Sequence, residues 1–334
     1  MPNTRLFVVD HGPRGLVAID LSPPAGPIIH APLPLPQFPL PQFPLPQFPV
    51  PPFPLPPLPL PHPAPPSPLG AFLRPRFPLP PPHLASPKMK GLVGATLQPN
   101  GHIAVADRVT NAIRSYDPGT GAWVTLIASG LDGPTGVAAR PDGQIYVVDI
   151  GASRRLFLLD PVTATLTELL VGGLLTAPSA VTVTTAGAVW IADQERGLRL
   201  AQPPSGALAP PLPPAMDHLG RPTRSVWCHV SAGPNDSVVA TDLAGGRVVL
   251  VMPDFSVIPL AERKDGLRVP VSAVMVSPPP GGPALWILDA GANAVLGYVE
   301  DAGSWVLRQT VSGHNPNGTS IFTRPVALVV EVLP

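Results

Sequence analysis

The stretch Gly101–Gly121, GHIAVADRVTNAIRSYDPGTG, decides the fold. It contains two short apolar runs, IAVAD and AIRSY, joined by a polar link and followed by a glycine-containing turn, which is the pattern of two strands of a β-sheet. Runs like the first occur six times along the chain, and each ends in an aspartate: Asp10, Asp107, Asp149, Asp193, Asp242 and Asp289. From Asp107 onward these aspartates lie 42, 44, 49 and 47 residues apart. Such a period, filled with short strands, predicts an all-β protein of the β-propeller class.

The number of strands predicts six blades and the way in which the ring closes. Residues 5–21 supply only two strands, whereas the units from about residue 86 onward supply up to four each. One strand, residues 324–333, is left over at the C-terminus and has the character of an inner strand. We expect it to complete the first blade, because this pairing leaves no open sheet edge at the seam. We expect the fourth blade to lose its outer strand to a proline cluster, residues 203–214.

A proline-rich segment interrupts the first blade. The chain has 54 prolines among 334 residues, about three times the usual share. The unit Pro36–Leu40, PQFPL, repeats with little change through residue 50, and no charged residue occurs from position 22 to 73. Proline at this density forbids helix and favours polyproline II. The predicted organisation is therefore residues 1–30 as first strands of blade 1, 31–83 as an arm in place of the outermost strand of that blade, and 84–334 as the remaining propeller.

The arm carries apolar side chains at regular intervals, unlike ordinary linkers, which are polar. A five-residue period does not match the three residues per turn of polyproline II, so successive Phe side chains point to different sides. A rod of this kind is suited to being surrounded, and we expect it to contact a protein partner or further copies of the chain. The expected partner-binding residues are Phe38, Phe43, Phe48, Phe53, Leu58 and Phe77.

Two other interpretations of the arm stay open at this point. One is a simple repeat expansion that has no role. The other is recognition by WW or EVH1 domains, which bind polyproline II in aromatic grooves, and residues 56–59 and 77–82 resemble such ligands.

The repeated unit resembles the NHL-repeat family of six-bladed propellers, and more distantly the gluconolactonase-like and strictosidine-synthase-like propellers. The shared motif is Gly-x-hydrophobic-x-Val-x-Asp, a small residue or Asn, and a strand that ends in Asp-x-x-Gly. The residues that carry it are Gly101, Asp107, Asn111, Asp117 and Gly119, again Gly143, Asp149 and Asp160, and in part Asp289 and Asn293. The resemblance covers residues 5–21 and about 86–334, and it implies a fold rather than one activity.

The sequence contains no convincing catalytic group, and we expect no metal and no cofactor. The six repeated aspartates belong to different blades, so we interpret them as turn residues that accept backbone N–H groups. Gluconolactonase-like relatives place Glu, Asn and Asp around the tunnel, whereas the matching starts of inner strands in this chain read Thr135-Gly136, Ser179-Ala180 and Ser272-Ala273. Amidating-lyase-like relatives need several histidines, and only His229 falls in a predicted inner strand. We expect His229 to face the tunnel with its hydrogen bonds satisfied, and Cys228 to point to the opposite side of its strand.

These observations favour a non-enzymatic scaffold or binding module, with a metal-dependent hydrolase of the lactonase or esterase kind as the alternative. The net charge is zero, so the chain lacks the excess of positive charge that is typical of proteins that bind nucleic acid. The single cysteine, Cys228, excludes an internal disulfide framework. The N-terminal residues lack the pattern of a secretory signal, and no proline-free apolar stretch is long enough for a transmembrane helix. We expect a cytoplasmic location or assembly into a complex.

Overall fold

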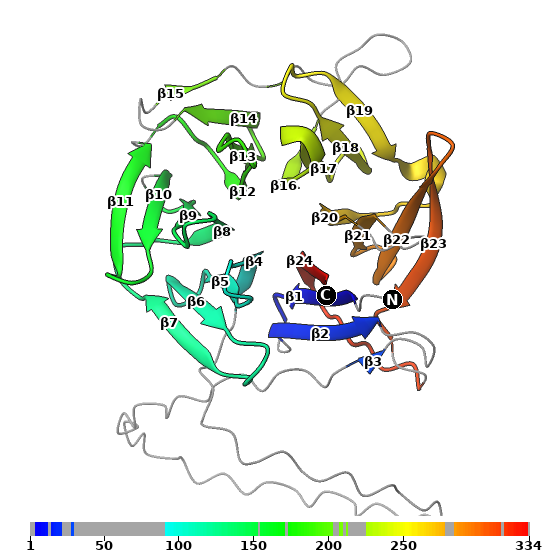
Figure 1. Cartoon of the computed structure of the whole chain (residues 1–334), viewed down its shortest axis with the longest axis horizontal. Coiled ribbons are helices and arrows are strands. Elements are labelled where there is room, and N and C mark those ends of the chain that lie inside the picture. The colour runs from blue at the N-terminus through cyan, green and yellow to red at the C-terminus, as the bar shows by residue number, and fades with distance from the viewer. Residues whose placement is uncertain are drawn as a thin grey trace, which may run out of the picture.

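A computed structural model describes residues 4–12, 15–21, 28–29, 91–152, 154–170, 173–202, 207–209, 212, 225–277, 284–314 and 317–332. Within these ranges the chain forms six four-stranded antiparallel sheets, which are arranged around a central axis like the blades of a propeller (Figure 1). The six-bladed all-β fold predicted from the 42- to 49-residue period is therefore confirmed.

Each sheet begins with its innermost strand at the tunnel and continues outward. The first sheet holds β24 (Pro325–Val332), β1 (Thr4–Asp10), β2 (Gly15–Leu21) and β3 (Ile28–Ile29). The second holds β4 (Leu92–Leu97), β5 (Ile103–Asp107), β6 (Ala112–Tyr116) and β7 (Trp123–Ile127). The third holds β8 (Pro134–Ala139), β9 (Ile145–Asp149), β10 (Arg155–Asp160) and β11 (Thr165–Leu170).

The remaining three sheets have the same strand order. The fourth holds β12 (Pro178–Val183), β13 (Val189–Asp193), β14 (Gly197–Gln202) and β15 (Ala207–Leu208). The fifth holds β16 (Trp227–Ala232), β17 (Val238–Asp242), β18 (Arg247–Val251) and β19 (Val257–Ala261). The sixth holds β20 (Pro270–Met275), β21 (Leu285–Asp289), β22 (Ala294–Asp301) and β23 (Ser304–Ser312). Two short 3₁₀ turns, η1 (Pro234–Asp236) and η2 (Arg263–Asp265), lie in connections of the fifth and sixth units.

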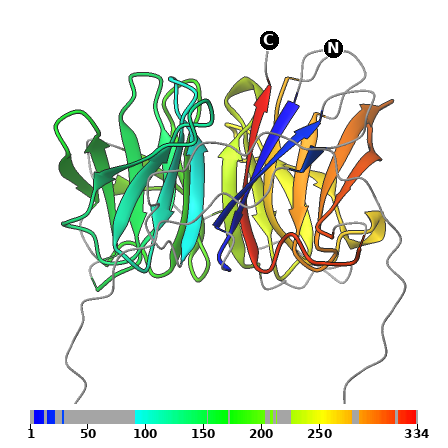
Figure 2. The ribbon, with the colours of Figure 1, turned by 90° about the horizontal axis from the view of Figure 1, so that it is seen from below.

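The two ends of the chain meet in the first sheet. Strand β24 pairs with β1 along its whole length, from Thr4 opposite Val332 to Asp10 opposite Pro325. In the edge-on view of Figure 2, β24 and β1 cross the thickness of the ring side by side. The innermost strand of this sheet thus comes from one end of the sequence and its other strands from the opposite end, so the ring is closed by backbone hydrogen bonds.

Two outer strands differ from the expectations drawn from the sequence. The fourth sheet keeps a short outer strand, because Ala207 and Leu208 pair with β14 inside the proline cluster. In the first sheet the two-residue strand β3 occupies the outermost position that we assigned to the proline-rich segment. Both strands are only two residues long, so neither has an alternating pattern that the sequence could show. Residues 31–83, the predicted arm, lie outside the described residues.

The core of the protein lies between the blades, in six separate clusters. Strand β1 shows the principle, because alternate residues of a strand point to opposite faces: Leu6 and Val8 pack against the sixth blade, while Phe7 and Val9 pack against the second. All four of these side chains are fully buried. A strand that is buried on both faces must be apolar at every position, which explains why LFVVD and its five repeats do not alternate.

The described part of the chain has no helix with the length and apolar character needed to cross a membrane.

Candidate functional site

The six repeated aspartates are buried and hydrogen-bonded to backbone N–H groups. In its own turn, Asp10 accepts a bond from Gly12 at 3.0 Å, Asp149 from Gly151 at 2.9 Å and Asp289 from Ala292 at 3.0 Å. Similar bonds within the turn are made by Asp107, Asp193 and Asp242. These are the contacts of an Asx-type turn, in which the side chain takes the place of a backbone acceptor.

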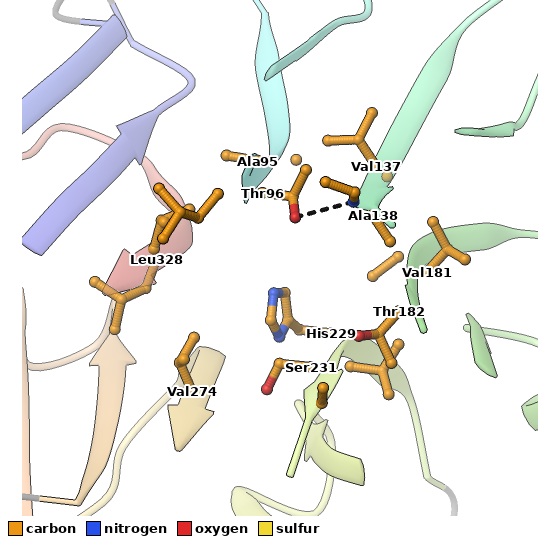
Figure 3. A pocket seen from close by; sticks show the side chains of 18 of the residues that line it. Ala95, Thr96, Val137, Ala138, Val181, Thr182, His229, Ser231, Val274 and Leu328 are labelled. Carbon is orange, nitrogen blue, oxygen red and sulfur yellow. Dashed lines mark hydrogen bonds between the residues drawn. The ribbon is translucent and has the colours of Figure 1, made fainter. Parts of the chain in front are cut away.

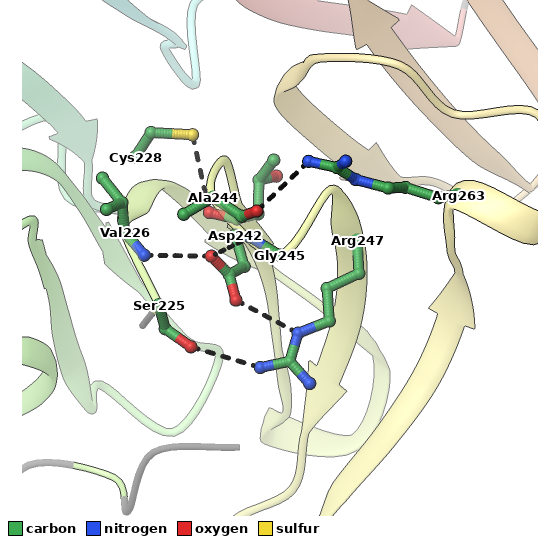
Figure 4. Close-up of polar contacts among 9 residues, drawn as sticks. Ser225, Val226, Cys228, Asp242, Ala244, Gly245, Arg247 and Arg263 are labelled. Carbon is green, nitrogen blue, oxygen red and sulfur yellow. Dashed lines mark hydrogen bonds and ion pairs between the residues drawn. The ribbon is translucent and has the colours of Figure 1, made fainter. Parts of the chain in front are cut away.

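Five of these carboxylates also hold the connection that enters their blade from the preceding one. Figure 4 shows the arrangement at Asp242, which accepts a hydrogen bond from the backbone of Val226 at 2.9 Å and from the guanidinium of Arg247 at 3.1 Å. Equivalent bonds to incoming connections are made by Asp10, Asp149, Asp193 and Asp289. At Asp107 the connection before Gly91 lies outside the described residues. Each of the five aspartates therefore ties its own turn to the incoming connection, whereas the sequence alone indicated only the turn.

The oxygen atoms of these carboxylates thus accept hydrogen bonds within the blades and their connections. Each of the six belongs to a different sheet, so they do not form one cluster. In the residues that the structure describes, no three His, Cys, Asp or Glu side chains are grouped so that they could hold a metal ion.

The tunnel is lined by the innermost strand of each blade, and each of these strands carries a β-bulge at its second residue. The bulge is visible as a register shift between the inner strand and its neighbour in all six sheets. The six bulged residues are Val93, Thr135, Ser179, Cys228, Val271 and Val326, and all six line a cavity of about 250 Å³ at one end of the tunnel. A bulge turns a side chain out of the regular alternation, and one side chain from each blade therefore lines this cavity. We call these six residues the bulge ring.

Three bulged residues in consecutive blades bond the next blade. Thr135 donates its hydroxyl to the Pro178 carbonyl at 2.8 Å, and Ser179 donates to the Trp227 carbonyl at 3.2 Å. The sulfur of Cys228 lies 3.9 Å from the equivalent carbonyl oxygen, that of Pro270, and 3.5 Å from that of Val271. The other three positions are Val and have no side-chain donor. The comparison of inner strands in the sequence treated Ser272 as equivalent to Ser179. With the bulges in place, the residue equivalent to Ser179 is Val271, and Ser272 lies one position further on.

A second cavity, of about 300 Å³, occupies the tunnel beside the bulge ring. Its wall is formed mainly by aliphatic residues from all six inner strands. Its polar members include Thr96, Thr182, His229 and Ser231, which Figure 3 labels, and also Ser179 and Cys228. The expected tunnel position of His229 is found, but the expectation that its hydrogen bonds are satisfied is wrong. Its Nδ1 atom is buried without a hydrogen-bond partner. Burial lowers the pKa of His229 to about 4, so the imidazole is neutral at neutral pH.

Cys228 and His229 do not form a reactive pair. The Cys228 sulfur contacts the carbonyl groups of Thr241 and Val271. Burial raises the pKa of the thiol to about 12, so the nucleophilic thiolate is not populated near neutral pH. The expected partner-binding residues Phe38, Phe43, Phe48, Phe53, Leu58 and Phe77 lie outside the described residues, so their role stays a prediction.

A scan against models of protein families found no match, and a search of curated proteins found no relative. Solved structures are similar in fold. A chain of a nidogen/laminin complex has a TM-score of 0.63 at 13% identity, with 98% of each chain covered. A streptogramin B lyase has a TM-score of 0.54 at 14% identity and covers 72% of this chain and 73% of its own. The virginiamycin B lyase from Staphylococcus aureus has a TM-score of 0.51 at 14% identity, with 69% and 72% covered. At these identities the likeness concerns the fold, which binding proteins and enzymes share.

Proposed function

We propose that this protein is a non-enzymatic binding module, in which the propeller is a rigid head and the proline-rich residues 31–83 join it to a larger protein assembly. The observation that carries the proposal is the place of this segment in the chain. Residues 30–91 connect β3, the outermost strand of the first sheet, to β4, the innermost strand of the second. The described strands on its two sides thus belong to different sheets, and the ring closes through β24 and β1.

The composition of the segment supports a role in assembly. Its repeated Phe, Leu and Val residues offer apolar surface that a soluble monomer rarely leaves uncovered, and burying each Phe contributes roughly 1.5–3 kcal/mol. Proline restricts the free chain, so less entropy is lost on docking than with a Gly/Ser linker. The similar chain from a nidogen/laminin complex belongs to a protein assembly, which is consistent with a propeller used for binding.

The alternative of a metal-dependent hydrolase is less well supported. Lyases share the fold, but the repeated carboxylates of this chain are engaged by backbone N–H groups of their own turns and of the incoming connections. Metal analysis of the purified protein separates the two functions, because a divalent ion bound at one equivalent in the tunnel would favour the hydrolase.

The proposal is tested by deleting residues 32–83 and joining the flanking residues. Circular dichroism and the melting temperature should stay close to those of the intact chain, since no described strand is removed. Light scattering should show a smaller mass for the deleted chain than for the intact chain, or pull-down from the native source should no longer recover the partners of the intact chain. A deleted chain that keeps both the assembly state and the partners of the intact chain would overturn the proposal.

A further inference from the structure

His229 occupies a position at which the other five blades carry a small residue. The position is the third of each inner strand, directly after the bulge, and it is defined by pairing with the neighbouring strand; His229, for example, lies opposite Thr241. The equivalent residues in the other blades are Gly94, Gly136, Ala180, Ser272 and Ala327. A ring of small residues is therefore interrupted once, by an imidazole.

The packing of the blades explains why this position is small. A Cβ atom added at Gly94 would lie 2.5 Å from the carbonyl oxygen of Thr135 in the next blade, and one added at Gly136 would lie 2.7 Å from the Cα atom of Ala180. These distances leave no space for a large side chain between neighbouring inner strands. The imidazole of His229 is accommodated in the tunnel instead, and Figure 3 shows its ring projecting into the cavity.

Two hydroxyl groups near His229 are engaged with backbone groups of neighbouring blades, whereas its own Nδ1 is not hydrogen-bonded. Ser231 donates its hydroxyl to the Ala273 carbonyl at 2.8 Å, and Thr96 accepts a hydrogen bond from the Ala139 backbone at 3.2 Å. The buried Nδ1 of His229 has no partner. A buried polar atom without a partner destabilises the folded state, and alanine at this position would avoid that cost. Residues that break a local pattern without an evident structural gain concentrate at functional or strained sites.

We propose that the tunnel cavity at His229 binds a small, uncharged and mainly apolar molecule, which forms a hydrogen bond with the imidazole through a hydroxyl or amide group. The described residues that line the cavity include no charged side chain, so an ionic ligand would lose its hydration without gaining a counter-charge. A neutral imidazole offers one donor and one acceptor, which a hydroxyl group can match. At the ~30 Å³ that a water molecule occupies, a 300 Å³ cavity holds a ligand of roughly ten non-hydrogen atoms.

This inference is independent of the proline-rich segment and is tested with three aromatic probes of similar size. Phenol is neutral and polar, toluene lacks the hydroxyl, and benzoate is charged. In protein labelled with ¹⁵N-histidine, phenol should shift the imidazole resonances of His229. Titration calorimetry should give a phenol affinity at least tenfold higher than that of toluene, and benzoate should not compete with phenol.

Two variants provide the matched comparison. His229→Ala restores the small residue found at this position in the other blades, and it should reduce the preference for phenol over toluene to within about twofold. His102→Ala changes a histidine of a surface turn and should bind both probes as the intact protein does. The proposal is overturned if phenol leaves the His229 resonances of the intact protein unchanged, as water alone at Nδ1 would, or if phenol binds no better than toluene.

Discussion

The carboxylate of Asp10 accepts a hydrogen bond of 2.6 Å from the backbone N–H of Arg324, although 314 positions separate the two residues in the sequence. The same side chain also accepts bonds from the backbone and the hydroxyl of Thr323, at 2.8 and 2.7 Å. Asp10 is completely buried. It therefore fastens the start of β24 to the end of β1, at the place where the two halves of the first blade must find each other.

Replacing this carboxylate should weaken closure of the ring. Asp10→Ala leaves the donors of Gly12, Thr323 and Arg324 without their acceptor, and each buried donor left unpaired costs roughly 1–3 kcal/mol. We expect the free energy of unfolding to fall by about 3–5 kcal/mol, measured by urea denaturation. The control is Asp160→Ala, which removes an aspartate from an exposed turn and should have a much smaller effect. Equal losses in the two variants would contradict a special role for Asp10.

The thiol of Cys228 should be unreactive in the folded protein. Burial raises its pKa to about 12, and the thiolate is the reactive form. Because the chain has one cysteine, labelling with Ellman's reagent at pH 8 reports this position alone. We expect no labelling over the time in which the urea-unfolded chain reacts completely. Rapid labelling of the folded protein would show that the tunnel wall opens at β16.

The stability of the protein should depend on pH through His229. Its pKa is about 4 in the folded protein against an ordinary value of 6.5, so the unfolded chain takes up a proton at a higher pH than the folded chain does. The contribution of His229 to stability is therefore constant above pH 6.5 and becomes unfavourable as the pH falls from 6.5 to 4. One pKa unit corresponds to about 1.4 kcal/mol, so the loss approaches about 3 kcal/mol at pH 4.

The matched measurement compares intact protein with His229→Ala by urea denaturation at pH 7.5 and pH 4.5. Carboxylates contribute equally to the pH dependence of stability in both proteins, and the thiol of Cys228 does not titrate in this range. The intact protein should lose more stability between the two pH values than the variant does. Parallel losses would show that the imidazole is protonated without cost inside the tunnel.

The period of the apolar repeats predicted the six blades because every blade needs a central strand that is buried on both faces, as IAVAD is at Ile103–Asp107. The short strands β3 and β15 could not be predicted because two residues cannot show a pattern. The turn contacts of the aspartates could be expected from the residue type, whereas the bond from Asp10 to Arg324 joins opposite ends of the chain and has no local signal.

The unusual character of His229 was present in the sequence but required the correct register. Only after the bulges are placed does His229 align with Gly94, Gly136 and the other small residues. Without the bulge, Ser179 appears equivalent to Ser272, and the ring of small residues is not apparent. The missing partner of Nδ1 depends on how neighbouring hydroxyl groups are used, which no sequence pattern records.

The most direct test of the proposed function changes the aromatic side chains of the proline-rich repeat and leaves its length and proline content unchanged. The triple variant Phe38→Ser, Phe43→Ser and Phe48→Ser removes one apolar side chain from each of three units. The matched control, Gln37→Ser, Gln42→Ser and Gln47→Ser, changes the adjacent residue in the same units. We expect the Phe variant to assemble roughly 1000-fold or more weakly, because each of the three buried Phe side chains contributes at least about 1.5 kcal/mol.

The measurement is light scattering over a concentration series, together with pull-down from the native source, for the intact chain and both variants. The account predicts that the Gln variant matches the intact chain, while the Phe variant has a smaller mass or loses the recovered partners. A Phe variant with the same mass and the same partners as the intact chain would contradict the proposal that this segment joins the propeller to an assembly.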